Sequence, residues 1–88
     1  MKWFLYLAEC QDKSIYTGVS ADVDRRLREH NSGKGGDYTR TKRPLKLIYV
    51  EPASSRDEAL KRESQIKRWA RRKKLALASG DKELLKLL

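Results

Sequence analysis

The chain has 88 residues, of which 21 are lysine or arginine and 12 are aspartate or glutamate, so its formal net charge at pH 7 is +9. This length supports one small domain, which we place at residues 1–88. The positive charge is expected to attract polyanions, and nucleic acid is the first partner to consider. The single cysteine, Cys10, excludes an intrachain disulfide and a cysteine-built zinc site, and it fits a reducing compartment.

The first apolar run, Trp3–Ala8, is too short to cross a bilayer, which needs about 20 residues. It also lacks the charged, apolar and small-residue regions of a signal peptide. We therefore predict a cytoplasmic protein without a membrane partner.

Two runs of β-forming residues, Trp3–Ala8 and Ser14–Val19, flank a polar segment and predict a β-hairpin. Because side chains alternate between the faces of a sheet, Tyr6 and Tyr16 share a face only if the hairpin loop has an odd number of residues. We predict such a loop. Leu45–Val50 is predicted to be the third strand.

A first helix is predicted from about Ala21 to Asn31, with Ser20 as its N-cap. Arg26 and His30 are four residues apart, so both lie along one edge of the apolar stripe of this helix. A mobile, glycine-rich basic loop is expected to follow, from Gly33 to Pro44.

A second helix is predicted to start at the capping-box pattern of Ser55 and to end at about Trp69 or Ala70. Helical spacing places Glu63 in the middle of its apolar stripe, a costly position for a carboxylate without a partner. Beyond this helix, a basic cluster continues the helical surface, and a short amphipathic segment follows the break at Gly80. The expected nucleic-acid contacts are the basic residues of the loop and of this cluster: Lys34, Arg40, Lys42, Arg43, Arg71, Arg72, Lys73 and Lys74.

Five polar residues could together support phosphodiester hydrolysis, which needs a base, a fixed cation and usually a metal ion. Tyr6 and Tyr16 could accept a proton or position water, and Arg26 could balance charge on the phosphoryl oxygens. His30 would tune a neighbouring phenol or water, because a phenol with a pKa of about 10 is a poor base at neutral pH. Glu63 could bind magnesium, since one protein carboxylate suffices when phosphate and water fill the other positions.

These residues, in their order along the chain, resemble the GIY-YIG nuclease domain, and in particular its small stand-alone bacterial-type proteins of the UPF0213 kind. The resemblance spans about residues 2–75, which we take as the core, and leaves 76–88 as a short helical extension. It is carried by Phe4-Leu5-Tyr6, Tyr16-Thr17-Gly18, Arg26 with His30, and Glu63. The resemblance implies that the two tripeptides lie on adjacent strands, that Gly18 is structural at the site, and that Glu63 binds one divalent metal ion, Mg²⁺ or Mn²⁺.

Each residue also has a structural alternative. The two tyrosines could be ordinary strand aromatics, and Gly18 could mark a bulge or turn. Arg26 could be a solvated helix arginine, and His30 could simply favour the negative end of its helix. A structural ion pair between Arg26 and Glu63 would explain an inward carboxylate without catalysis.

The predicted fold is α/β, a small, mainly antiparallel three-stranded sheet flanked by helices in the order β-β-α-β-α-α. The predicted function is a divalent-metal-dependent DNA endonuclease, with repair or recombination as an expected setting. The alternatives are a non-catalytic nucleic-acid-binding module on the same fold, and a subunit whose substrate choice comes from a protein partner.

Overall fold

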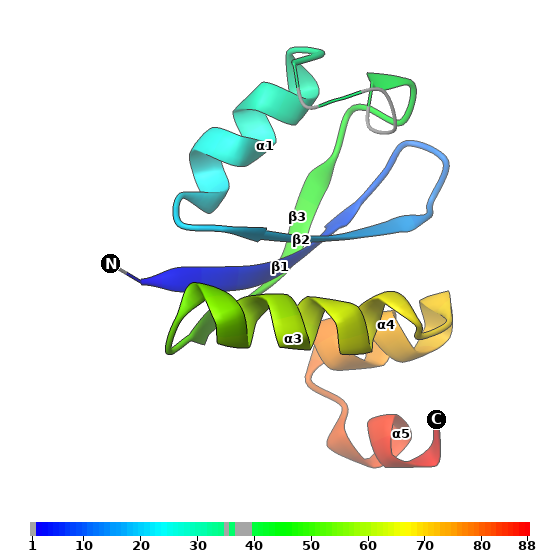
Figure 1. Ribbon diagram of the computed structural model, residues 1–88. Coiled ribbons are helices and arrows are strands. Elements are labelled where there is room, and N and C mark those ends of the chain that lie inside the picture. Colours follow the sequence, from blue (N-terminus) through cyan, green and yellow to red (C-terminus); the bar gives the residue numbers. More distant parts are fainter. Residues whose placement is uncertain (1, 35, 37–39) are drawn as a thin grey trace.

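The computed structural model describes residues 2–34, 36 and 40–88. Figure 1 shows a sheet with one helix above it and further helices below. In chain order, the elements are β1 (Trp3–Glu9), β2 (Ile15–Ser20), α1 (Val23–Asn31), β3 (Lys46–Ala53), α3 (Arg56–Lys67), α4 (Arg71–Ser79) and α5 (Lys82–Leu87). This order confirms the predicted fold class, with one more short helix at the C-terminal end than predicted.

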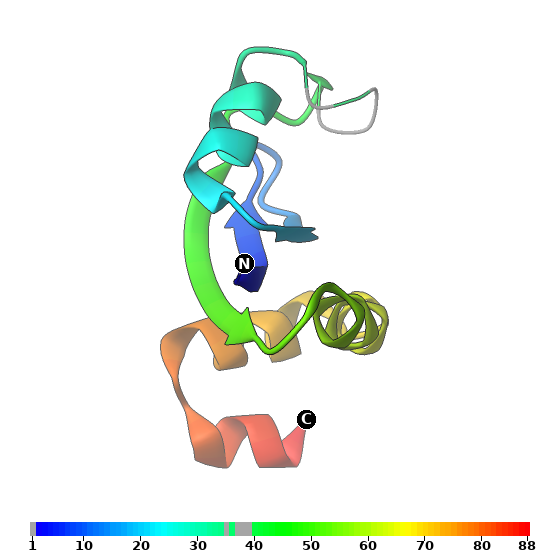
Figure 2. The same ribbon diagram turned by 60° about the vertical axis from the view of Figure 1, so that its left-hand side comes forward.

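The described strands form a three-stranded antiparallel sheet in the order β2-β1-β3. The loop between β1 and β2 runs from Cys10 to Ser14, five residues, which confirms the predicted odd number. Tyr6 therefore pairs with Gly18, Ala8 pairs with Tyr16, and the two tyrosines share a face. Figure 2 shows that β3 curves strongly along the sheet.

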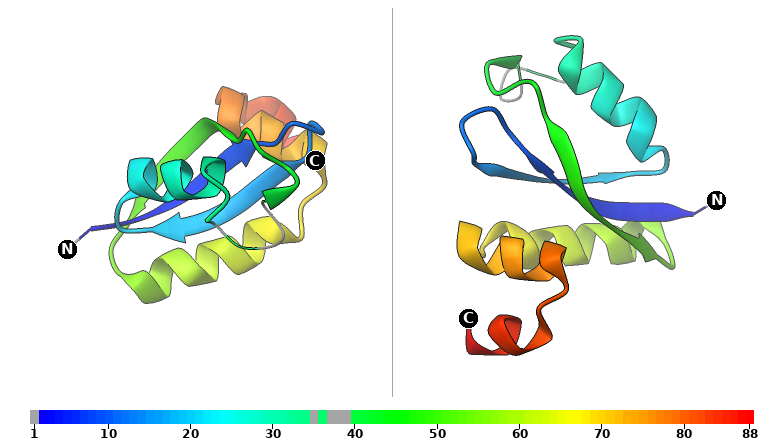
Figure 3. Two further views of the ribbon diagram at one scale, coloured as in Figure 1. Left: turned by 90° about the horizontal axis from the view of Figure 1, so that it is seen from above. Right: turned by 180° about the vertical axis from the view of Figure 1, so that it is seen from behind.

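The two faces of the sheet carry separate hydrophobic clusters. Above, α1 packs Val23 and Leu27 against the face that contains Tyr6. Below, Ile66 of α3 packs against Leu5 and Leu7 of β1. Figure 3 (left) shows α3 running alongside β2, so that α3 lies next to the edge strand that carries Tyr16.

A bulge in β3 allows side chains of this strand to pack in both hydrophobic clusters. Leu7 pairs with Tyr49 and Ala8 pairs with Leu47, which leaves Ile48 as the extra residue. Leu47 packs in the upper cluster, whereas Ile48 and Tyr49 both pack in the lower one. The strand extends to Ala53, beyond the predicted end at Val50, because Pro52 is tolerated on an edge strand.

The predicted start of the first helix was wrong. Ser20 ends β2 and its hydroxyl accepts a hydrogen bond from the Asp22 backbone N–H at 3.0 Å. Asp22 is therefore the N-cap, and its carboxylate accepts from Arg25 N–H at 3.1 Å. At the other end, the Asn31 side chain accepts from the Leu45 N–H at 2.7 Å and donates to the Leu45 carbonyl at 3.1 Å. This pair ties the end of α1 to the start of β3 across the basic loop.

The second predicted helix starts as expected and ends earlier than expected. The Ser55 hydroxyl caps α3 by accepting from Glu58 N–H at 3.1 Å. The helix ends at Lys67 with Arg68 as the C-cap, and Ala70 is extended, so α4 begins a new direction. Ala76 of α4 is buried.

Gly80 ends α4 in the left-handed conformation, with φ of 75°, as the predicted break requires. The α5 helix follows, capped by Asp81. No helix in the described part of the chain is long and apolar enough to cross a membrane.

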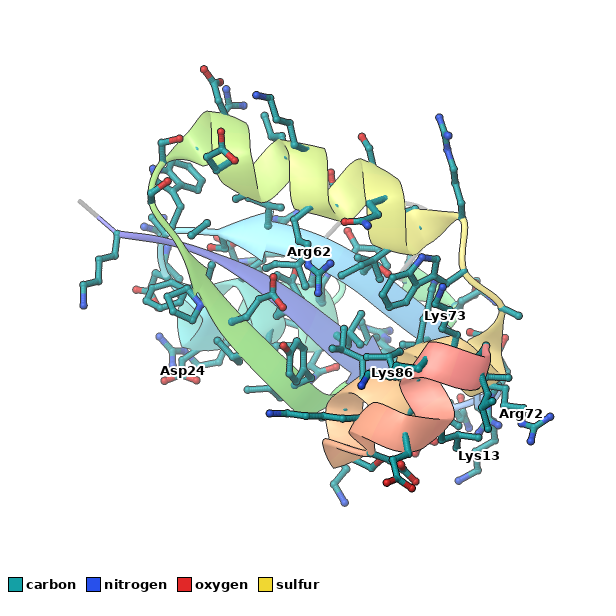
Figure 4. All side chains as sticks on the ribbon, turned by 90° about the horizontal axis from the view of Figure 1, so that it is seen from below. Lys13, Asp24, Arg62, Arg72, Lys73 and Lys86 are labelled. Atoms are coloured by element: carbon teal, nitrogen blue, oxygen red, sulfur yellow. The ribbon has the colours of Figure 1, made fainter. Side chains whose placement is uncertain are left out.

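A polar network fastens α3 to β3 on the lower face. The Arg62 Nε donates to Glu51 Oε2 at 2.8 Å, and the Tyr49 hydroxyl donates to Glu51 Oε1 at 2.6 Å. Figure 4 shows Arg62 reaching from α3 across the underside of the sheet. Burial and the bond to Glu51 raise the pKa of Tyr49 to about 12. Arg62 also stacks on Trp69, with 5.6 Å between its guanidinium carbon and the ring centroid.

Candidate active site

The upper face brings both tyrosines, Gly18 and the histidine into one cluster. The ring centroids of Tyr6 and Tyr16 are 6.2 Å apart, and those of Tyr16 and His30 are 5.1 Å apart with an edge-on geometry. Tyr6 is buried, with 1% of its surface exposed, whereas Tyr16 on the edge strand is half-buried. Of the two phenols, Tyr16 is thus the more accessible to a ligand.

Glycine is required opposite the Tyr6 ring. A Cβ at Gly18 would lie 2.5 Å from both Cζ and the hydroxyl oxygen of Tyr6. No side chain fits at that distance, so Tyr6 occupies the space above the backbone of β2. Gly18 therefore determines where the Tyr6 hydroxyl sits.

Tyr6 and His30 are joined by a hydrogen bond from helix to sheet, with 3.3 Å between the Tyr6 hydroxyl and His30 Nε2. Both side chains are buried, and burial shifts both toward their neutral forms. Burial lowers the pKa of His30 below 6.5, and the nearby Arg26 lowers it further. Burial likewise raises the pKa of Tyr6 far above its ordinary value, with Tyr16 and Glu63 adding to the rise and Arg26 opposing it. Near neutral pH, Tyr6 is a protonated phenol beside a neutral imidazole.

Arg26 projects from α1 at the edge of this cluster. Its Nη1 lies 3.2 Å from Glu29 Oε1, one turn along the helix. Arg25 Nε lies 3.7 Å from the other oxygen of Glu29, but its side chain is 71% exposed. Arg26, whose charge shifts the pKa of both Tyr6 and His30, is therefore the arginine at the cluster.

Glu63 approaches the cluster from α3. Its side chain is only 18% exposed, between the fully buried Ala59 and Ile66 on the same helix, as the apolar stripe predicted. The carboxylate Oε2 lies 3.6 Å from Lys67 Nζ, so Lys67 supplies a positive charge at this position. Glu63 is also close enough to Tyr6 to raise the pKa of that phenol.

The donor set around Glu63 fits a hard divalent cation. The Glu63 carboxylate lies 3.6 Å from the Lys67 ammonium, and its charge reaches the Tyr6 phenol, whose pKa it raises. Among the described residues, no three His, Cys, Asp or Glu side chains are grouped so that they could hold a metal ion, so water and substrate would have to supply most of the ligands. Mg²⁺ suits such a place because it usually keeps several waters and shares one or two carboxylates with substrate phosphates.

The basic residues that we expected to contact nucleic acid fall into two groups. Several hold the fold together: Lys42 Nζ lies 2.6 Å from Asp12 Oδ2, and Arg71 Nε donates to the Lys13 carbonyl at 2.6 Å. Lys73 lies over the Trp69 ring at 4.3 Å from its centroid. Arg72 instead points outward from α4 (Figure 4), and Lys34, Arg40 and Arg43 are also exposed. Asp37, the acidic residue of the basic loop, lies outside the described residues.

Sequence reasoning overlooked two charged neighbours of the site. Glu29 holds Arg26 by an i,i+3 ion pair, and Lys67 pairs with Glu63 at i,i+4. Both spacings are readable in the sequence as helical pairs. On a chain with so many charges, however, spacing alone does not distinguish these pairs from ordinary solvated ones.

Comparison with known proteins assigns the chain to a family. The GIY-YIG catalytic domain matches residues 2–76, and the chain belongs to this family. Membership confirms the resemblance noted in the sequence and places the chain among nuclease-type domains.

Within that family, the chain is similar to UPF0213 proteins. It is 45% identical over 78 residues to one from Staphylococcus saprophyticus, covering 89% of this chain and 95% of that protein. It is 48% identical over 75 residues to one from Haloquadratum walsbyi, covering 85% of this chain and 84% of the relative.

Two solved structures resemble the fold. The solution NMR structure of a UPF0213 protein from Bacillus halodurans matches with a TM-score of 0.56 and 44% identity, covering 90% of this chain and 84% of the other. The solution NMR structure of a protein from E. faecalis matches with a TM-score of 0.58 and 39% identity, covering 84% and 79%.

Proposed function

We propose that this chain is a divalent-metal-dependent endonuclease that hydrolyses phosphodiester bonds in DNA, acting in the cytoplasm in repair or recombination. The observation that carries the proposal is the contact of Tyr6 with both His30 and Tyr16 above Gly18. Arg26 and Glu63 lie within electrostatic reach of the same Tyr6 hydroxyl. Family membership supplies the nuclease class, and this constellation supplies groups suited to the reaction.

Each residue of the cluster would have a distinct role in the reaction. Arg26, with a side chain 37% exposed, would pair with phosphoryl oxygens as negative charge gathers on them. Tyr16, on the open edge of the sheet, would contact the phosphate or the attacking water. Tyr6 stays protonated, so it would act as a hydrogen-bond donor and positioning residue, held by His30.

Glu63 would hold the metal ion, Mg²⁺ or Mn²⁺. When bound, the ion would polarise the phosphate and stabilise the leaving oxygen. The Lys67 ammonium, which now neutralises Glu63, would have to separate from the carboxylate on metal binding.

One observation favours the rival function of a non-catalytic nucleic-acid-binding module. The ion pair with Lys67 satisfies the Glu63 carboxylate without a metal ion. On this alternative, the basic surface binds nucleic acid, and a protein partner supplies any activity or specificity.

The deciding experiment compares Glu63→Gln with Glu58→Gln. Both changes remove one carboxylate from α3, but Glu58 lies in the exposed first turn beside Lys61, away from the cluster. Labelled single-stranded, nicked, flapped and branched DNA would be incubated with each protein and with Mg²⁺, Mn²⁺ or chelator. We expect chelator and Glu63→Gln to abolish cleavage, Glu58→Gln to preserve it, and Glu63→Gln to fold with similar stability.

Metal titration in the presence of DNA provides the second readout, because a site with one carboxylate needs the phosphate to complete it. Glu63→Gln should weaken the metal affinity, while DNA binding in chelator persists. Equal metal affinity for wild type and Glu63→Gln, with no cleavage by either, would instead establish the binding module.

A further inference from the structure

A cavity of about 460 Å³ lies between β2 and the junction of α3 with α4. It is lined by Ile15, Tyr16 and Thr17 of the strand and by Lys67 and Lys74 of the helices. Because β2 is an edge strand, no further strand of the described sheet covers its outer side. Figure 3 (left) shows α3 alongside this strand, with α4 following where α3 ends.

The helical side of the cavity is cationic. Lys74 Nζ donates a hydrogen bond to the Ile15 carbonyl at 3.4 Å, which holds the ammonium against the strand. Burial lowers the pKa of Lys74, and the proximity of Lys67 lowers it further. Lys67 is already paired with the Glu63 carboxylate at 3.6 Å, so Lys74 is the ammonium of the two that would gain most from a bound anion.

The strand side of the cavity includes Thr17, whose hydroxyl is buried without a hydrogen-bond partner among the described residues. Thr17 is 3% exposed. A buried hydroxyl normally has a partner, and one that lacks it destabilises the fold. Because this oxygen is buried, a ligand oxygen in the cavity would supply the missing bond only once the Thr17 side chain rotates toward the cavity.

We propose that this cavity binds a backbone phosphate of the nucleic-acid strand, next to the phosphate held at Tyr16 and Arg26. The proposal rests on the proposed function for the position of the second phosphate. Tyr16 links the two places, because its ring packs against His30 and the residue is also part of the cavity lining. A strand carries one phosphate per nucleotide, so a strand bound at Tyr16 brings a neighbouring phosphate to the lysines, which bind phosphate as point charges.

Binding would be measured in chelator, so that no cleavage is needed. The probe is a fluorescent thymidine tetranucleotide, and the variants are Lys74→Gln, Thr17→Val and the control Lys61→Gln, which removes one exposed lysine of α3. Lys74→Gln should bind the tetranucleotide about tenfold more weakly than wild type, because it loses one charge-assisted hydrogen bond. The slope of log affinity against log salt should fall by about 0.7 for the single strand. Lys61→Gln should bind within about twofold of wild type, because an exposed pair contributes little.

Thr17→Val tests the cavity with a variant that is expected to fold normally. Valine has nearly the shape of threonine and removes a hydroxyl without a partner, so this variant should fold at least as well as wild type. It should nevertheless bind the tetranucleotide more weakly. In NMR titrations of wild type, the Thr17 and Lys74 resonances should shift with the same dissociation constant as the fluorescence signal.

The outcomes separate this inference from the proposed function. Weaker binding by Lys74→Gln and Thr17→Val, with shifts at Thr17, supports the cavity even if no DNA is cleaved with any metal. Metal-dependent cleavage together with identical binding by Lys74→Gln and Lys61→Gln overturns the cavity alone. Unmoved Thr17 resonances at saturating tetranucleotide would overturn it as well.

Discussion

The aromatic ring of Tyr6 occupies the space that a side chain at Gly18 would need. The two residues are opposite one another on β1 and β2, and a Cβ at Gly18 would stand 2.5 Å from the Tyr6 hydroxyl oxygen. Tyr6 in turn contacts His30 on α1. Because Gly18 has no side chain, the Tyr6 ring can lie over β2. Its hydroxyl then contacts His30, which connects the sheet to α1.

Gly18→Ala should displace the Tyr6 ring. Overpacking of this kind costs about 1–3 kcal/mol of unfolding free energy, measurable by urea denaturation. In a Tyr6→Ala background, the same change should cost far less, because the clashing ring is gone. A double-mutant cycle with a coupling energy near zero would show that Tyr6 does not impose the glycine.

Arg26→Ala should reduce single-turnover DNA cleavage by about 3 kcal/mol in activation free energy, comparable to removing one preorganised donor to a developing oxyanion. Arg26→Lys should rescue poorly, because an ammonium cannot reproduce the planar two-pronged contact. Arg25→Ala is the matched control: this arginine also pairs with Glu29 but is 71% exposed. Equal rates for Arg26→Ala and Arg25→Ala, with both proteins folded, would remove Arg26 from the mechanism.

Local patterns in the sequence were sufficient to predict the hairpin, its odd loop and the shared face of the two tyrosines. Alternation of side chains determines the face once the loop length is right, and the capping box at Ser55 determines the start of α3. The family resemblance identified the candidate residues of the site as one set. Their contacts with one another depend on how α1 and α3 pack on the sheet, which no local pattern encodes.

The errors in the helix boundaries have two sources, competing local hydrogen bonds and tertiary contacts. Ser20 and Asp22 both suit an N-cap, and the bond from Asp22 N–H to the Ser20 hydroxyl decides in favour of Asp22. The end of α3 depends on how Trp69 packs beneath the sheet, a tertiary contact. Thr17 was missed for a related reason, because a cavity forms only when distant segments meet.

Arg62→Ala should destabilise the protein by about 1–3 kcal/mol, since it removes charged hydrogen bonds to Glu51 and the stacking on Trp69. Both charged side chains are mostly buried, at 30% and 23% exposed, so solvent screens them only partly. Lys61→Ala is the control on the adjacent position of α3, and it should change stability by less than about 0.5 kcal/mol. Urea denaturation of both variants measures the difference, and similar values for the two would show that the network does not anchor α3.

We expect Arg71 to contribute to stability and Arg72 to contribute to DNA binding. Arg71→Ala removes the bond to the Lys13 carbonyl and the ion pair with Glu9, so we expect a loss of about 1 kcal/mol in unfolding free energy. Arg72→Ala should leave stability unchanged and weaken DNA binding, with the log–log salt slope falling by about 0.9 on duplex DNA if a phosphate contact is lost. An unchanged slope for Arg72→Ala would mean that this charge serves solubility or another partner.

His30 should make stability depend on pH in the mildly acidic range. Burial and Arg26 hold its folded-state pKa below the ordinary value of 6.5, so the unfolded state binds a proton more readily between these two pKa values. The contribution of the neutral imidazole is complete above pH 6.5 and is lost as the pH falls toward the folded-state pKa, with a slope of at most about 1.4 kcal/mol per pH unit. His30→Gln, which keeps a hydrogen-bonding group beside Tyr6, should not show this loss. Urea denaturation from pH 8 to pH 5 gives the difference in unfolding free energy between wild type and His30→Gln. Carboxylate titrations common to both proteins cancel in this difference. A difference that stays constant across this pH range would contradict a buried neutral histidine.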